Sequence, residues 1–345
     1  MSHTTAIDTH AHILSEETIR MIAKEAPKVA PKLTPTDNDF GILEVAGTPY
    51  RPFPRGGWDM ERRLKDMAFS EVDVQVLSNT PQTFLYNQDA ALNATVSALQ
   101  NDQIAKAVAS QPGRFRGIAT LPMQAPQRAA DELKRAMRSL GLKGAHIGSN
   151  INGKNLDDPE FDVLWAMANE LDAFIMVHPT QVAGADRLKS YYLTNLIGNP
   201  LDSTIAAASL VFSGVVERYP AIKFLFVHGG GFVPWQMGRF SHGWHVRPEP
   251  QVKLKQPPEV SLNRLYFDSI LHARPQLECL VTLAGSARVV LGSDYPFDMG
   301  TLECARQVKA LSIADADKAA ILSGTPLKLL GEATTSSERV KVAHG

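Results

Sequence analysis

Cysteine, excess charge and long apolar runs are all scarce in this chain. It has two cysteines, Cys279 and Cys304, in 345 residues. That is too few for a disulfide framework, so we interpret both as small apolar residues. A formal net charge of −1 and a pI near 6.8 give no electrostatic reason to expect nucleic acid or an anionic membrane surface as a partner. No apolar run is long enough to cross a bilayer, and the first residues lack the basic end and apolar stretch of a secretory signal. These absences predict a soluble cytoplasmic protein.

Hydrophobic residues make up 44% of the chain, and their pattern alternates between two types of segment. Short runs rich in Val, Ile, Leu and Phe are typical of parallel strands that are buried on both faces. Eight such strands are predicted, at residues 6–13, 72–77, 115–121, 142–147, 173–178, 223–228, 264–268 and 288–294. Apolar residues spaced by three and four predict helices at residues 90–111, 125–140, 159–171, 204–219 and 275–284. The alternation favours an α/β fold, a (β/α)8 TIM-type barrel, over an open doubly wound sheet.

We expect one barrel domain over residues 1–332. A small insertion after the first strand, at about residues 15–58, is rich in Pro and Gly, and an insertion of this length in a compact domain is usually functional. Residues 333–345 are polar and predict a flexible tail.

Histidine and aspartate stand at the carboxyl ends of four predicted strands, the edge at which barrel enzymes place their chemistry. His10 and His12 belong to the first strand, His178 to the fifth, His228 to the sixth and Asp294 to the eighth. Because side chains alternate along a strand, His10 and His12 point to the same side and can bind one metal ion. Three imidazoles and a carboxylate form a ligand set suited to zinc. The pattern therefore predicts a metalloenzyme.

Each of these histidines also has a plainer interpretation. A single histidine at a strand end is more often a hydrogen-bonded structural residue than a ligand, and an isolated His-x-His is a weak signal. The coincidence of four strand ends favours the metal site. His146, inside the fourth strand, is interpreted as a barrel-interior residue, and the sequence leaves the roles of His242, His245 and His272 open.

The run His228-Gly229-Gly230-Gly231 offers a rival hypothesis, because HGGG runs build the oxyanion hole of many α/β-hydrolases. Those enzymes also need a G-x-S-x-G motif, which this sequence lacks. We therefore expect the glycines to let the backbone turn sharply after the sixth strand.

Several short motifs together resemble one group of proteins. They are Ile7-Asp8-Thr9-His10-Ala11-His12, Tyr50-Arg51-Pro52, Val72-Asp73-Val74-Gln75-Val76, Thr80-Pro81, Val177-His178-Pro179, His228-Gly229-Gly230-Gly231, Gly238-Arg239, Phe267-Asp268-Ser269 and Leu291-Gly292-Ser293-Asp294-Tyr295-Pro296-Phe297. From about Ile7 to Leu330 the chain resembles the α-amino-β-carboxymuconate-ε-semialdehyde decarboxylase-like group of the amidohydrolase superfamily.

The resemblance implies one zinc ion per subunit, bound by His10, His12, His178 and Asp294 together with water, and manganese is the alternative metal. It implies two catalytic residues, Asp294 and His228, of which His228 takes a proton from that water. Binuclear relatives carry a bridging lysine at the end of strand four, whereas this chain has His146-Ile147-Gly148-Ser149 there. We therefore expect a single metal.

The resemblance also implies that Arg51, Arg239 and Phe297 bind the substrate, and that Arg239 acts across the interface of a homodimer. A guanidinium group suits bidentate binding of a carboxylate, although a solvated surface position is the common alternative for an arginine. The implied activity is non-oxidative decarboxylation of a small unsaturated or aromatic carboxylic acid. Thr180 replaces the tryptophan of the group, which points to a different substrate shape.

Two other classes of function stay open. A metal-dependent hydrolase, such as a lactonase, or a hydratase would use the same zinc, water and His228. A non-catalytic binding protein is the weaker alternative, because the expected ligand set leaves a metal position for water.

Overall fold

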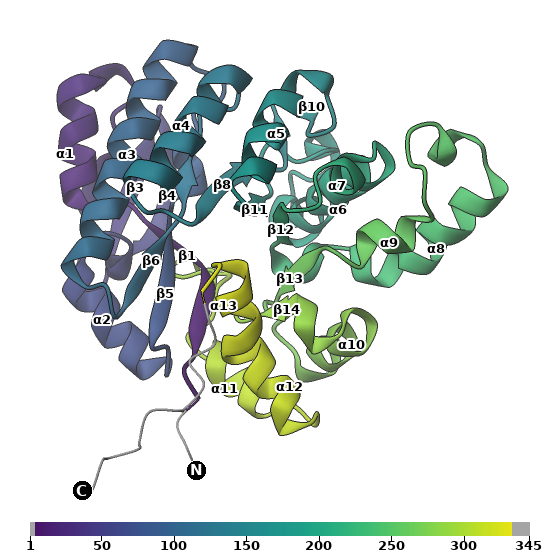
Figure 1. Ribbon diagram of the computed structural model, residues 1–345. Helices are drawn as coiled ribbons and strands as arrows, with labels where there is room; N and C mark the ends of the chain where they lie inside the picture. Colours follow the sequence, from purple (N-terminus) through teal and green to yellow (C-terminus); the bar gives the residue numbers. More distant parts are fainter. Residues whose placement is uncertain (1–3, 333–345) are drawn as a thin grey trace, which may run out of the picture.

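A barrel of parallel strands forms the centre of the protein (Figure 1). The structure is a computed structural model and describes residues 4–332. The barrel strands are β1 (Ile7–Ile13), β5 (Val74–Asn79), β6 (Phe115–Gly117) with β7 (Ala119–Thr120), β8 (Gly144–Gly148), β11 (Phe174–His178), β12 (Lys223–Phe226), β13 (Tyr266–Asp268) and β14 (Val289–Val290). The predicted (β/α)8 barrel is confirmed, and each predicted strand overlaps an observed one. The predicted tail at residues 333–345 lies outside the described residues.

Pairing between neighbours follows chain order around the barrel. One sheet has the order β1-β5-β6, and the other runs from β7 through β8, β11, β12 and β13 to β14, with every pair parallel. Only Ile118 separates β6 from β7, and its N–H donates to the Leu77 carbonyl at 3.0 Å. These two short strands therefore form the third strand of the barrel, interrupted by one residue.

The last strand meets the first and closes the barrel. The N–H of Thr9 donates to the carbonyl of Leu291 at 2.9 Å, and Ala11 forms a parallel bridge with Tyr295. The buried carboxylate of Asp8 reinforces this seam, because it accepts hydrogen bonds from the N–H and the hydroxyl of Ser293 at 3.0 and 2.5 Å. Backbone pairing and a buried polar contact thus join two segments from opposite ends of the chain.

Helices cover the outside of the barrel. They are α2 (Met60–Phe69), α3 (Ala90–Ser110), α4 (Pro126–Ser139), α5 (Asp162–Glu170), α6 (Asn199–Phe212), α7 (Val215–Arg218), α8 (Val233–Val246), α9 (Pro258–Leu262), α10 (Arg274–Ala284), α11 (Cys304–Lys309), α12 (Asp315–Ala319) and α13 (Thr325–Leu329). The predicted helices at 90–111, 125–140, 159–171 and 275–284 match α3, α4, α5 and α10 closely. Asp89 shows why α3 begins where it does, since its side chain accepts from the N–H groups of Ala91 and Leu92.

The prediction of one helix over residues 204–219 is wrong at its start and in its continuity. α6 begins five residues earlier, at Asn199, with Pro200 in its first turn. It ends at Phe212 because Gly214 adopts a φ of +74°, which no helix accommodates, and α7 starts anew at Val215.

The insertion between β1 and α2 folds into a small unit of its own. It consists of α1 (Glu16–Glu25) and an antiparallel sheet of β2 (Lys32–Pro35), β3 (Phe40–Val45) and β4 (Thr48–Pro54). Leu14, Ile22, Leu43 and Phe53 form a separate buried cluster beneath it. A second pair of short strands, β9 (Asn150–Ile151) and β10 (Lys154–Asn155), follows β8. The segment between β1 and α2, where an insertion at about residues 15–58 is predicted, is thus ordered in the structure.

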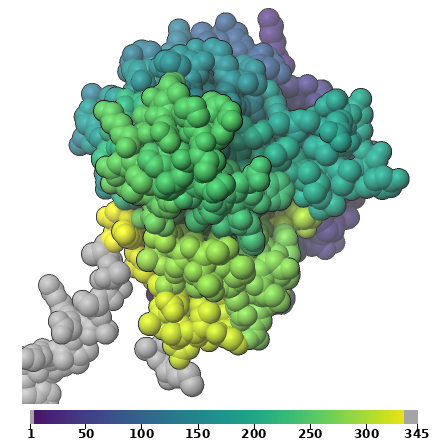
Figure 2. Space-filling view, turned by 90° about the vertical axis from the view of Figure 1, so that its right-hand side faces the viewer, coloured from purple at the N-terminus to yellow at the C-terminus, as the bar shows by residue number. Residues whose placement is uncertain are grey.

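An arm made of α8, α9 and the segment between them projects from one side of the barrel (Figure 1). In Figure 2, where this side faces the viewer, the green arm lies above the yellow-green segments around α10. Across residues 4–332, no helix combines the length and the apolar character needed to span a membrane.

Candidate metal centre

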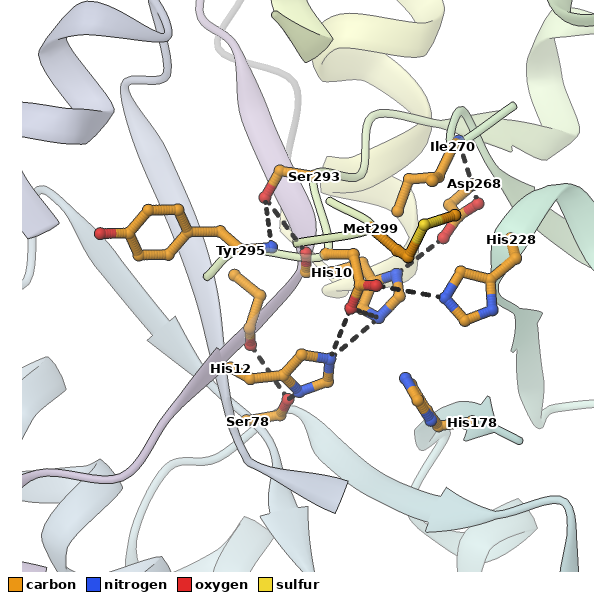
Figure 3. Close-up of polar contacts among 12 residues, drawn as sticks. His10, His12, Ser78, His178, His228, Asp268, Ile270, Ser293, Tyr295 and Met299 are labelled. Carbon is orange, nitrogen blue, oxygen red and sulfur yellow. Dashed lines mark hydrogen bonds and ion pairs between the residues drawn. The ribbon is translucent and has the colours of Figure 1, made fainter. Parts of the chain in front are cut away.

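Four buried side chains converge at the carboxyl end of the barrel. His10 and His12 come from β1, His178 is the last residue of β11, and Asp294 follows β14. One ligand atom from each lies within 4.8 Å of those of the other three. Figure 3 shows the imidazoles of His10, His12 and His178 turned toward a common point. The structure thus brings together all four residues predicted as metal ligands.

The spacing of the ligand atoms of His10, His12 and Asp294 suits a single bound ion. The Nε2 atoms of His10 and His12 are 3.0 Å apart, and Oδ1 of Asp294 lies 3.3 Å from the first and 3.2 Å from the second. Bonds of about 2.0–2.1 Å from an ion to nitrogen and oxygen place two tetrahedral ligands roughly 3.3 Å apart. The observed separations lie close to that value.

The other ring nitrogen of each histidine is already engaged. Nδ1 of His10 donates to Oδ2 of Asp268 at 2.8 Å. Nδ1 of His12 donates to the hydroxyl of Ser78 at 2.9 Å. Nδ1 of His178 donates to the Pro179 carbonyl at 3.0 Å. These contacts leave the Nε2 lone pairs directed inward, which is the arrangement usual for metal-binding histidines. Within the described part of the chain, Nε2 of His178 and Oδ1 of Asp294 have no hydrogen-bond partner although both are buried. Unsatisfied buried acceptors of this kind fit a bound cation.

The electrostatics of the cluster also favour a positive charge. Burial alone would lower the pKa of His10, but the carboxylates of Asp294 and Asp268 outweigh it and raise that pKa to about 10. Burial together with the charge of His10 lowers the pKa of His12 to about 4. Burial would raise the pKa of Asp294, yet His10 and the other imidazoles hold it well below its ordinary value. The carboxylates around His10 thus favour a positive charge at this position, which either a proton on His10 or a metal ion can supply.

His228 lies beside the cluster but outside the group of four. It follows β12, and its Nε2 atom is 3.4 Å from Oδ2 of Asp294, the oxygen that faces away from His10 and His12. Its side chain is 17% exposed, more than those of the four converging residues. Its Nδ1 atom has no partner among residues 4–332. His228 can therefore reach a small molecule at the metal position without serving as a ligand.

The glycine turn predicted after His228 is present. Gly230 and Gly231 adopt φ values of +76° and +60°, and a Cβ on Gly231 would lie 2.1 Å from the Pro200 carbonyl oxygen. Only glycine fits this close approach to the start of α6. His228 itself has a φ of +56° and Asp294 a φ of +54°, a sparsely populated region that is often found at functional sites.

Asp268, at the end of β13, contacts the site at two places, and no role for it was predicted from the sequence. Besides accepting from His10, it accepts hydrogen bonds at Oδ1 from the N–H groups of Gly229 at 2.8 Å and Ile270 at 3.2 Å. It therefore fixes the ring of His10 and the turn that carries His228 at the same time. Its position at the end of the predicted seventh strand, the edge at which barrel sites form, could have indicated a role at the site.

His146 lies inside the barrel, as predicted, and is fully buried. Its Nδ1 atom donates to the Asn79 carbonyl at 3.2 Å, and its ring contacts those of His12, His178 and Phe84. The group of converging ligand atoms does not include it. His146 supports the ligands from behind, and the geometry of the described residues agrees with one metal position.

A cavity of about 260 Å3 opens onto the cluster and is lined by His178, His228 and Asp294. Phe297 lines it too, with its ring centroid 5.2 Å from that of His12. Arg51 on β4 and Arg239 on α8 are both exposed and lie outside this lining. Of the three residues predicted to bind substrate, the subunit brings only Phe297 to the cavity.

The remaining histidines that the structure describes lie away from the metal position. His242 and His245 are exposed on α8, where Nδ1 of His245 donates to the Ser241 carbonyl at 2.8 Å. His272, in the loop after β13, is exposed and lines a neighbouring cavity.

Comparisons with known proteins agree with this fold and site. Residues 7–331 match the amidohydrolase family. The chain is 34% identical, over 94% of its length and 91% of the other's, to 2-amino-3-carboxymuconate-6-semialdehyde decarboxylase from Dictyostelium discoideum. The 5-carboxyvanillate decarboxylase from Sphingomonas paucimobilis has the same fold, with a TM-score of 0.82 at 21% identity over 96% of this chain and 100% of that one. A dihydroxybenzoic acid decarboxylase from a Polaromonas species, solved with bound manganese, gives a TM-score of 0.78 at 23% identity over 95% and 97% of the two chains. The chain belongs to the amidohydrolase family.

Proposed function

We propose that the protein is a metal-dependent carboxy-lyase, which removes carbon dioxide from a small unsaturated or aromatic carboxylic acid without an oxidant. The observation that carries the proposal is the convergence of His10, His12, His178 and Asp294 on one point, with His228 beside them. Relatives named as decarboxylases, among them the Dictyostelium protein, support the same reaction type.

We propose zinc as the metal, one ion per subunit, with manganese as the alternative. Three imidazole nitrogens and one carboxylate oxygen suit zinc, which accepts nitrogen ligands readily and can expand from four ligands to five when water also binds. Manganese favours sites richer in oxygen, but the Polaromonas decarboxylase was solved with manganese. Metal analysis of the purified protein decides between the two.

When bound, the metal supplies a Lewis acid that makes water more acidic and stabilises developing negative charge. His228 accepts a proton at Nε2, from water in the cavity that it lines together with Asp294. Cleavage of the bond between carbon and the carboxyl group releases carbon dioxide and leaves an electron pair on the substrate carbon. The imidazolium of His228 then gives its proton to that carbon, and the hydroxide left from the water combines with the carbon dioxide as bicarbonate. The carboxylate and one water molecule thus become the protonated product and bicarbonate, so that atoms and charge balance.

Recognition of the substrate carboxylate is the least complete part of the site in one subunit. Among the described residues that line the metal cavity none is Lys or Arg, and Asp294 and Asp298 both contribute negative charge. We propose that a homodimer completes the site. Arg239 then reaches the carboxylate from the neighbouring subunit, and Arg51 approaches from the insertion. The exposure of both arginines in the single subunit is compatible with this role.

A hydrolase of lactones or amides, or a hydratase, is the second candidate function. The unsatisfied acceptors and His228 would serve the addition of water to a carbonyl or a double bond equally well. The loss of carbon as carbon dioxide separates the two candidates.

The test is a substrate panel on protein reconstituted with zinc or with manganese. The panel contains carboxylated semialdehydes, hydroxybenzoates and lactones. We expect metal-dependent release of carbon dioxide from at least one carboxylic acid, and loss of this activity after chelation. Turnover of lactones alone, or water addition without loss of carbon, would show that the second candidate function is correct.

A further inference from the structure

A second cavity, of about 390 Å3, adjoins the metal cavity and has a different character. The two share His228, Asn195, Asn199 and Met299 as lining residues. The rest of the second cavity is mainly apolar, and we call it the apolar chamber. Its apolar lining residues are Leu196, Pro200, Phe232, Trp235, Ile270 and Leu271. Figure 3 shows Ile270 and Met299 close to Asp268 and His228, where the chamber meets the metal centre.

From this arrangement we infer that the substrate has two unlike parts. A carboxylate-bearing part occupies the metal cavity, and an uncharged aromatic or branched aliphatic substituent occupies the apolar chamber. This inference rests on the proposed function, and it names the class of substrate that the site takes.

The size of the chamber supports a substituent of this kind. An apolar cavity of about 150 Å3 in a protein interior is enough to bind benzene. The apolar chamber is larger than that, so a single aromatic ring fits with room for a further small group. Ligand cavities of this size, mainly apolar with a few polar residues, are typical of binding sites for small molecules.

The charges around the two cavities disfavour a second anionic group in the chamber. Among the described residues that line it, none is Lys or Arg, and the ionisable ones are His228 and His272. A carboxylate placed against Ile270 and Leu271 would lose its hydration. Asp294, which lines the metal cavity across the boundary, would repel it.

The rim of the chamber carries apolar side chains that are unusually open to solvent. Leu196 is 48% exposed, Trp235 39% and Phe232 37%. Covering such surface with an apolar group is favourable, at roughly 25 cal/mol for each Å2 removed from water. Because the chamber shares its inner wall with the metal cavity, the substrate itself is the occupant that we assign to it.

The test compares the affinity of 2-hydroxybenzoate with that of its 3-, 4- and 5-phenyl derivatives, by titration of the metal-loaded full-length protein. The inference predicts that at least one derivative binds about tenfold more tightly than the parent or better, since burial of a ring outweighs the cost of ordering it. The ratio of the two affinities requires no turnover. The predicted gain in affinity can therefore be absent while metal-dependent release of carbon dioxide, the test of the proposed function, is still observed.

A matched pair of variants locates the effect. Leu196 lines the chamber, whereas its neighbour Ile197 is 43% exposed on the same turn, Thr194–Gly198, and lies outside the lining. Leu196→Asp should abolish the gain from the phenyl group, and Ile197→Asp should preserve it. The inference is overturned if no derivative binds more tightly than 2-hydroxybenzoate, if neither compound binds, or if the gain survives in Leu196→Asp. If the gain is absent and Leu196→Asp also converts a dimer to a monomer in sedimentation, a second copy covers the chamber, and the inference is again overturned.

Discussion

Oδ2 of Asp268 accepts a hydrogen bond from Nδ1 of His10 at 2.8 Å, and both side chains are fully buried. The bond fixes the tautomer of His10 and leaves its Nε2 lone pair free to face the other converging ligands. Oδ1 of the same carboxylate holds the backbone of Gly229. One aspartate on strand β13 therefore positions both the imidazole of His10, a member of the converging group, and the turn after His228.

Asp268→Asn should lower metal affinity by about 10- to 100-fold, because an amide nitrogen facing Nδ1 disfavours the required tautomer. Competition with a chelator measures this affinity. Asp202→Asn is the matched control, since Asp202 is also a buried carboxylate that anchors a loop, accepting from Asn150 and Ala183. Equal metal affinity in the two variants would contradict the role of Asp268.

Replacement of a converging residue should reduce the amount of bound metal more than replacement of Asp268 does. His10→Ala, His178→Ala and Asp294→Ala each remove an atom of the group of four, so each should lose bound metal and turnover together. His146→Gln is the control, since His146 is buried beside the ligands but outside that group. Full metal occupancy in all three alanine variants, determined by elemental analysis, would refute the ligand assignment.

His228→Ala should retain its metal and lose on the order of a hundredfold or more in kcat, the usual scale for a lost general base. The reason is geometric, since Nε2 of His228 reaches the cavity without belonging to the converging group. Metal content and kcat are measured on the same preparation, with His245→Ala on the exposed face of α8 as the control. Near-normal kcat would remove His228 from catalysis, and loss of metal would make it a ligand.

Mixing two inactive variants tests whether Arg239 acts across a dimer. Arg51→Ala and Arg239→Ala should each lose activity, because each removes a cation that binds the carboxylate. After subunit exchange, a mixed dimer has one site with both arginines and one site with neither, so part of the activity should return. Mixing Arg51→Ala with an Arg51→Ala, Arg239→Ala double variant is the control that should show no rescue. Mixed dimers without recovery in the first experiment would show that Arg239 does not act in trans.

Glu332 provides a test of stability against pH, far from the metal. Its carboxylate accepts from Nε of Arg116 at 2.7 Å and lies 3.2 Å from Nζ of Lys143. Burial alone would raise the pKa of Glu332, but these two cations hold it below its ordinary value. A lowered pKa in the folded state stabilises the protein above the unfolded-state pKa, near 4.5, and this stabilisation is lost as pH falls through the folded-state pKa.

Glu332→Gln should therefore reduce the free energy of unfolding by about 1 kcal/mol at neutral pH. The difference from the wild type should shrink as pH falls below about 4.5, where the unfolded-state carboxylate takes up a proton. Urea unfolding at several pH values measures it. Glu249→Gln, which alters a solvent-exposed pair with Arg247, should have no measurable effect at any of them. A difference that grows toward low pH would refute the argument.

Much of the barrel and the converging group could be predicted from the sequence for one physical reason. Parallel strands buried on both faces appear as apolar runs, and a polar residue at the carboxyl end of such a run, such as His178 or Asp294, lies at the edge where barrel sites form. Because His10 and His12 are two residues apart on a strand, their side chains are also expected to point to the same side. These patterns involve residues that are close together in the sequence, so they can be recognised without the structure.

The features that the sequence did not reveal depend on contacts between distant segments. The role of Asp268 becomes visible only when β13 lies beside the strand that carries His10. The apolar chamber is formed from three segments, near residues 196, 232 and 271, none of which has a distinctive local pattern. The break between α6 and α7 follows from the left-handed conformation of Gly214, which an apolar periodicity does not report.

The seam between the first and last strands has a consequence for how the protein acquires its metal. Asp8 and Ser293, which join the seam, are 285 residues apart in the chain. Three of the four converging residues, His10, His12 and Asp294, come from the same two ends of the chain. A nascent chain that still lacks its last barrel strand has the two histidines of β1 but not the carboxylate of Asp294. The complete set of ligands therefore exists only after synthesis has passed the eighth strand and the barrel has closed. Because the ion then binds the closed form in preference to the open one, loading with metal also makes closure harder to reverse.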